Sequence, residues 1–133
     1  MKEESPVGGL DLAALQQLIS ALNRIALGPA QSAIGVSNGT NAVEMVAAPP
    51  TNVRRVVTSI YISNPDTVAS VFAVRVNDGA TPRVLARQSL AADTYVNLTG
   101  EVVLDSTSKS LDMLLEAAHT TTAPEWVVTW RDE

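Results

Sequence analysis

The chain has 133 residues, of which 46% are hydrophobic, 17% charged and 4% aromatic, with no cysteine and one histidine. This length predicts one domain that can bury a core without disulfides or a structural metal. The lack of cysteine excludes zinc fingers, iron–sulfur centres, thiol nucleophiles and disulfide scaffolds, and His119 alone cannot build a multi-histidine metal site. We therefore expect neither a cofactor nor a metal.

The net charge of −5 comes from 14 acidic and nine basic residues, and the basic residues form no stripe along any segment. Nucleic acid is therefore not an expected partner. No run of 18 apolar residues exists, so no membrane span is expected. The start carries two acids and a proline where a secretory signal has a basic region and an apolar run, which predicts a soluble protein made in a cytoplasm and not secreted.

The first segment, 1–29, reads as an N-terminal arm with an amphipathic helix over about 12–28. Asp11 is the expected N-cap, and Gly28 followed by Pro29 is the expected stop. Apolar residues recur at spacings of three, four and three, as in a coiled-coil seam. This helix seam consists of Leu15, Leu18, Leu22 and Ile25.

From residue 30 to 133 the apolar period becomes two, and Val, Thr and Ile replace Leu and Gln. Strands are expected at 33–36, 43–46, 54–63, 68–77, 82–88, 95–98, 101–105, 111–117 and 126–131. Turn signals about every eight to twelve residues are typical of a sandwich. The predicted fold is mainly β: a jelly-roll-like antiparallel β-sandwich of seven to nine short strands with one N-terminal α-helix.

Segments 54–63 and 68–77 are expected to form a hairpin around the turn at 64–67. Strict alternation along the first strand groups its apolar residues with a threonine on one face, and the second strand has its own apolar face. The two faces are Val56, Thr58, Ile60 and Ile62 on the first strand, and Phe72, Val74 and Val76 on the second.

The residues offer little catalytic chemistry. His119 is the only side chain that would act as a base at neutral pH, and no nucleophile elbow places a serine beside it. Paired acids could in principle hydrolyse a glycoside; the candidates are Asp105, Asp112, Glu116 and Glu125. Asp112 and Glu116 are expected to lie on a solvated strand face, so no catalytic residue and no enzymatic activity are predicted.

Three other patterns have ordinary structural interpretations. The sequence Asn77-Asp78-Gly79 lacks the spaced acids of a calcium loop and reads as a turn. Arg54 and Arg55 point to opposite faces at the start of a strand, where one can cross a subunit contact. Trp126 and Trp130 share a strand face and are interpreted as covering the core or an interface.

The helix seam has two interpretations. It can pack on its own sandwich, or it can associate with other copies or a neighbouring protein, because an isolated helix of this length is marginally stable in water. The regular spacing and the break at Gly28 and Pro29 favour association, so we expect a homo-oligomer, with a trimer favoured, or docking of the arm on a neighbouring protein.

The segment from about 51 to 131 resembles the small β-sandwich virion proteins of tailed bacteriophages. The resemblance rests on the ordered motifs 63–66 (SNPD), 72–77 (FAVRVN), 90–95 (LAADTY), 111–115 (LDMLL) and 127–130 (VVTW). It implies a structural protein of the virion, head decoration (cement) type, whose partner is the major capsid protein or another virion protein. The alternatives are a neck, tail or fibre-base protein and, outside the virion, a carbohydrate-binding module that uses Trp126 or Trp130 and the loop at 120–122.

Overall fold

The computed structural model describes residues 12–27 and 29–133, and it describes the side chains of these residues except those of 20–27. One helix, α1, spans Leu12–Leu27 and is followed by nine strands. The strands are β1 (Ala30–Val36), β2 (Val43–Val46), β3 (Arg55–Asn64), β4 (Ser70–Asn77), β5 (Arg83–Leu90), β6 (Thr94–Leu98), β7 (Val102–Leu104), β8 (Ser110–Leu115) and β9 (Glu125–Asp132). Each predicted strand is present, with ends shifted by a few residues. The expected N-cap Asp11 and stop residue Gly28 lie outside the described residues.

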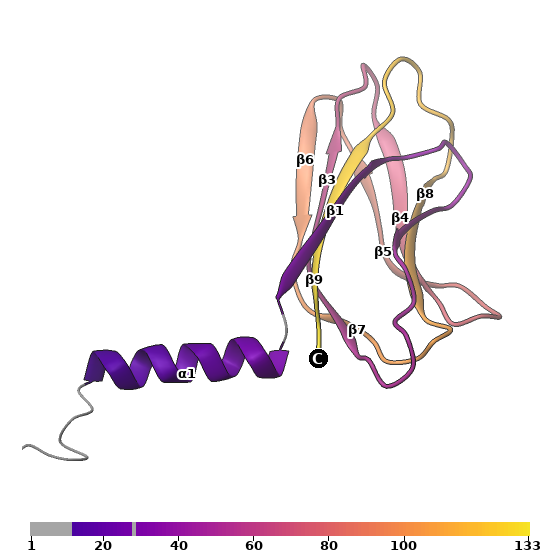
Figure 1. Ribbon diagram of the computed structural model, residues 1–133. Helices are drawn as coiled ribbons and strands as arrows, with labels where there is room; N and C mark the ends of the chain where they lie inside the picture. The colour runs from indigo at the N-terminus through magenta and orange to yellow at the C-terminus, as the bar shows by residue number, and fades with distance from the viewer. Residues whose placement is uncertain (1–11, 28) are drawn as a thin grey trace, which may run out of the picture.

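The strands form two antiparallel sheets that face each other (Figure 1). The first sheet has the order β1-β9-β3-β6, with β7 also paired to β3, and the second has the order β2-β8-β4-β5. Strands β6 and β7 pair with the two successive halves of β3, so they act as one interrupted strand. Counted in this way, eight strands form two sheets of four, and consecutive strands lie in opposite sheets except β4 and β5, which pair with each other. This is the arrangement of a jelly roll, and it confirms the predicted fold class.

The core lies between the two sheets and is built from the inward faces of the central strands. Phe72 and Val74 on β4 and Met113 on β8 are almost completely buried, and Val76 packs against them. The other buried apolar residues of the core are Met45, Val46, Val57, Ile60, Ile62, Leu90, Leu104, Leu111, Leu115, Trp126 and Val128. Because valine and leucine dominate this list, the core is thin and filled by many small contacts.

The predicted hairpin between 54–63 and 68–77 is wrong. Strand β3 pairs with β6, β7 and β9 in the first sheet, whereas β4 pairs with β5 and β8 in the second. The turn after Asn64 therefore crosses from one sheet to the other. Two buried side chains, Asn64 and Asp66, hold it there by hydrogen bonds to distant backbone. Turn-forming residues between two alternating runs indicate a reversal of the chain, but they do not choose between pairing and crossing.

Strict alternation along β3 is also wrong, because the register to β9 shifts between Val57 and Ser59. A bulge at this position turns Val57 toward the core together with Ile60 and Ile62. Thr58, predicted to share their face, instead donates its hydroxyl to the carbonyl oxygen of Thr129 at 3.2 Å. No sequence pattern at 56–60 marked this insertion.

Helix α1 stands to one side of the sandwich, joined to it only at the start of β1 (Figure 1). Within the described residues it makes no sustained contact with any strand. The helix predicted over about 12–28 is present at Leu12–Leu27. The structure does not show the interpretation in which this helix packs on its own sandwich. No helix of the described residues is long and apolar enough to cross a membrane.

Candidate functional site

The apolar stripe of α1 is open to solvent. Leu15 is 43% exposed, Leu18 50% and Ile19 49%, and Leu12, one turn earlier, is 70% exposed. These four side chains lie on one side of the helix because they recur every three or four residues. The side chains of the other two predicted seam residues, Leu22 and Ile25, lie outside the described residues, although their backbone is helical.

The opposite side of α1 presents smaller or polar residues. Ala13 and Gln17 are exposed and lie one turn apart, facing away from Leu15. A helix of 16 residues with no partner gains little stability from propensity alone. The exposed leucines are therefore where a partner would stabilise this element.

A second apolar surface lies on the outer face of the first sheet. The register places Ile34 of β1 beside Val127 of β9, and Val127 beside Tyr61 of β3. The ring of Tyr61 contacts that of Tyr95 on β6, with centroids 5.2 Å apart. Ile34 is 78% exposed and Tyr95 is 66% exposed. We call Ile34, Val127, Tyr61 and Tyr95 the apolar strip.

A groove of about 400 Å³ opens on the side of the sandwich between β5 and the interrupted strand β6–β7. Ile60 and Val74 form its floor, and Leu85 and Leu98 lie on its walls. Its one acidic side chain, Glu101, is in an ion pair with Arg131 at 3.3 Å. Asn97 and Thr99 also line the groove, so its lining is a mixture of polar and apolar groups.

Two buried polar side chains, Asn64 and Asp66, lie at the turn after β3 that crosses from the first sheet to the second. The amide of Asn64 donates to the carbonyl oxygens of Val68 at 2.9 Å and Leu90 at 3.0 Å, and its oxygen accepts the N–H of Asp66. The carboxylate of Asp66 is fully buried. Each of these groups has its hydrogen bonds satisfied, which is what burial of a polar side chain requires.

The Asp66 carboxylate binds the loop at 120–122. It accepts the backbone N–H groups of Thr120 and Thr121 at 2.8 Å, Thr122 at 3.2 Å and Thr67 at 2.9 Å. These donors, that of Thr120 foremost, lower the pKa of Asp66 to about 2 against the opposing effect of burial. The threonine loop is thus part of a structural anchor.

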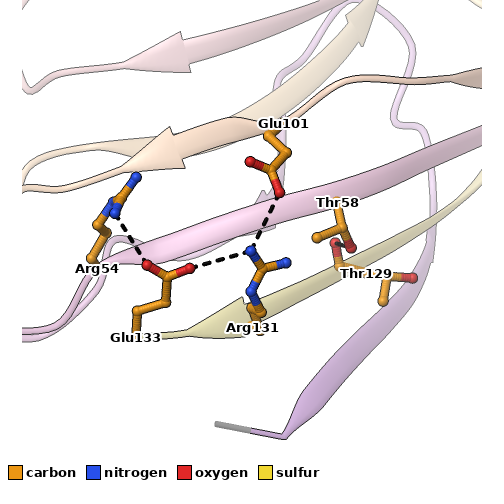
Figure 2. Close-up of polar contacts among 6 residues, drawn as sticks. All are labelled: Arg54, Thr58, Glu101, Thr129, Arg131 and Glu133. Atoms are coloured by element: carbon orange, nitrogen blue, oxygen red, sulfur yellow. Dashed lines mark hydrogen bonds and ion pairs between the residues drawn. The ribbon is translucent and has the colours of Figure 1, made fainter. Parts of the chain in front are cut away.

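A chain of ion pairs runs over the end of the first sheet, around Glu133 (Figure 2). Glu133 contacts Arg54 at 3.1 Å and Arg131 at 3.2 Å, and Arg131 also reaches Glu101 at 3.3 Å. Arg55 pairs separately with Asp132 at 2.9 Å. These contacts fasten the last residues to the start of β3. Exposed pairs of this kind contribute little stability and give no catalytic geometry.

The acids proposed for glycoside hydrolysis are not brought together as a catalytic pair. Asp112 was expected on a solvated face; this is wrong, because it is buried and forms a bidentate pair with Arg75 at 2.9 and 3.1 Å. Glu116 pairs with Arg87, and Asp105 pairs with Lys109 at 2.8 Å. Glu125 lies on the outer face of the first sheet. Arg75 stands opposite Asp112 in the register, a signal that the sequence alone does not reveal.

The remaining predicted residues also have structural positions. Trp126 is buried in the core with 4% exposure, so its ring is no platform for a sugar, and Trp130 packs half-buried against the same core. Asp78 accepts the N–H groups of Thr81 and Ala80, as a turn residue does, and these bonds lower its pKa. His119 is half-buried in the loop that Asp66 holds. Over residues 12–27 and 29–133, no three potential ligands gather into a metal site.

No protein-family model and no curated protein matches this chain. Among solved structures, it is similar to a protein of infectious bursal disease virus, Gx strain (TM-score 0.38, 6% identity, 80% of this chain and 33% of that one). It is also similar to the coat protein of Tobacco streak virus (0.39, 11%, 79% and 85%) and to the CBM22-1 xylan-binding domain of Paenibacillus barcinonensis Xyn10C (0.38, 13%, 80% and 81%). The chain spans about a third of the bursal disease virus protein. Likenesses at these TM-scores carry no argument for function.

Proposed function

We propose that this chain is a non-enzymatic structural protein of a virion, of the capsid decoration type, which self-associates through α1, with three copies favoured. The observation that carries the proposal is the uncovered leucine stripe of a helix that stands clear of a complete jelly roll. A sandwich with a finished core does not need this helix for its own burial. The helix therefore serves contact with other chains.

The spacing of the stripe favours other copies of the same chain as the first partner. Leu15 and Leu18, with Leu22 and Ile25 in sequence, follow the alternating three and four spacing by which helices of identical chains interlock side chains along a common seam. The 16 residues make a helix about 24 Å long. Its contact area is modest, so association is expected to depend on concentration and to gain from further contacts.

The particle role is supported by the composition and by the lack of catalytic chemistry in the described residues. A component that works outside the cell gains from stability that does not depend on redox conditions, and a core without cysteine provides this. The buried carboxylates of Asp66 and Asp112 hold a loop and join two strands, and the more exposed Glu116 and Asp105 pair with Arg87 and Lys109. The jelly-roll order and the ordered motifs described above favour a capsid surface as the second partner.

The decisive test of self-association compares two double variants in sedimentation velocity runs. Leu15→Asp with Leu18→Asp places two charges in the stripe, and Ala13→Asp with Gln17→Asp places the same charges on the opposite side. Burying a carboxylate in an apolar seam is strongly unfavourable, so the first variant should need about a hundredfold higher concentration to associate. The second variant should associate like the unmodified chain.

Equal association of both double variants would contradict the role of the stripe. Circular dichroism is the folding control, because the strand signal must persist in both variants for the comparison to hold.

For the particle role, cryo-electron microscopy of virions that carry the chain should show many copies spread over the capsid exterior. Density confined to the neck or tail would overturn the decoration role.

A further inference from the structure

Strand β1 is tied closely to α1. Only residues 28 and 29 separate Leu27, the last residue of the helix, from Ala30, the first residue of the strand. Three consecutive Cα steps span at most about 11 Å. An assembly that packs the α1 helices of several copies side by side and parallel, as rotational symmetry about one axis requires, therefore brings the start of β1 in each copy close to its neighbours.

Strand β1 is also an edge strand without protection. It pairs with β9 on one side in an unbroken register, and its other side has no strand partner among the described residues. Its sequence, AQSAIGV, has no charged residue and no proline, and Ile34 and Val36 are 78% and 52% exposed. Exposed edges usually carry charges, prolines or bulges that prevent pairing with other chains.

One of the two edge strands of the second sheet, β5, shows what such protection looks like. Strand β5 carries Arg83 and Arg87, and its register to β4 shifts between Val74 and Arg75. Two charges and a bulge on one edge, and neither on the other, indicate that β5 faces solvent whereas β1 is covered.

The apolar strip continues this surface across the outer face of the first sheet. Starting at Ile34, it runs over Val127 and Tyr61 to Tyr95, and so crosses four strands that lie about 4.8 Å apart. The residues directly beside it in the registers are uncharged apart from Glu125. A strip of this kind beside an unprotected edge is suited to an apolar protein surface.

We propose that the interface between copies extends from α1 onto the edge of β1 and the apolar strip, so that the partner of this face is a second copy of the chain. This inference rests on the proposed self-association through α1. The short connection between Leu27 and Ala30 selects the occupant, because it holds this face of each copy next to the seam where the helices meet. The contact enlarges an interface that the helix alone leaves small.

The first test introduces one charge on each edge. Ile34→Asp and Val84→Asp both replace an exposed aliphatic residue, 78% and 57% exposed, on β1 and β5 respectively. Sedimentation velocity over a concentration series should show that Ile34→Asp needs at least about tenfold more protein to associate, since one carboxylate is then desolvated in the contact. Val84→Asp should stay within about twofold of the unmodified chain.

The outcomes separate this inference from the proposed function. If Ile34→Asp associates as the unmodified chain does while the Leu15→Asp and Leu18→Asp variant dissociates, the β1 contact is refuted and the helix role stands. If the unmodified chain is a monomer, both are refuted.

A second measurement covers the case in which Ile34→Asp does not fold. The chain has no cysteine, so Ile34→Cys and Val84→Cys each contain a single thiol. A short bis-maleimide should join Ile34→Cys chains into covalent dimers and leave Val84→Cys chains single. Equal yields from the two variants would overturn the contact.

Discussion

At the scale of single residues, few polar or charged side chains are buried among the described residues, and three of them connect distant parts of the chain. Asn64 and Asp66 together fix a crossing between sheets and a loop more than 50 residues away in sequence. Asp112 on β8 joins this strand to β4 through its hydrogen bonds with Arg75. Each of these groups would be costly to bury alone and is satisfied by named partners. They stabilise the sandwich, and none is placed to act on a substrate.

Replacing Asp66 with Asn should destabilise the protein. The new amide group would oppose at least one backbone N–H that the carboxylate now accepts, such as that of Thr120. Loss of a charged, buried acceptor should lower the midpoint of thermal unfolding by about 5 °C or more. Differential scanning calorimetry measures this, with Asp93→Asn as the control, because Asp93 is exposed and Asn tolerates its positive φ of 57°. Equal midpoints would contradict the anchor.

The lowered pKa of Asp66 predicts that the protein loses stability in acid. Its pKa is about 2 in the folded protein, below the ordinary value of 3.8, so the unfolded chain binds a proton more readily. The contribution is therefore complete above pH 3.8 and is lost as the pH falls toward 2. Unfolding midpoints between pH 5 and pH 2 should fall more steeply for the unmodified chain than for Asp66→Asn. Parallel curves would show that Asp66 is not the group responsible.

At the scale of elements, the sequence was sufficient to predict helices and strands, because these follow from the local spacing of apolar residues. The helix and all nine strands were predicted near their observed positions, and the inward face of β4 was correct. The failures were contacts between distant segments. Pairing of β3 with β6, β7 and β9 depends on Asn64 and Asp66 finding backbone partners in loops, and the bulge at Thr58 depends on the register to β9. Local alternation contains neither piece of information.

The pairing of β1 with β9 depends on the glycine at position 35. The register places Gly35 opposite Trp126, and a Cβ at Gly35 would lie 2.2 Å from a ring carbon of that tryptophan. Because the ring is held in the core, Gly35→Val should destabilise the fold by about 1–3 kcal/mol. Urea unfolding measures this. Ser32→Val adds a valine to the exposed outer face of β1 and should leave stability nearly unchanged; a Gly35→Val protein as stable as this control would refute the close packing.

At the scale of the whole molecule, the apolar side chains of the sandwich are largely covered within one chain, whereas the described apolar side chains of the helix are exposed. The sandwich buries a continuous core within one chain, and its charged residues are mostly paired. Most of the exposed large apolar side chains among the described residues lie on the helix, the edge of β1 and the apolar strip, and the others are Val68, Val84 and Leu85. The sequence located the apolar stripe of α1, because the spacing of leucines is local. It missed the apolar strip, which forms only when β1, β9, β3 and β6 lie side by side.

The central claim is that this chain is a self-associating building block, and its mass in solution tests this most directly. Light scattering coupled to size exclusion, run on the full chain at concentrations of tens of micromolar, should give a multiple of 14.0 kDa, with three copies expected. The mass should fall toward that of one chain when Leu15 and Leu18 are both replaced by Asp. A mass of 14.0 kDa for the unmodified chain throughout this range would contradict the account.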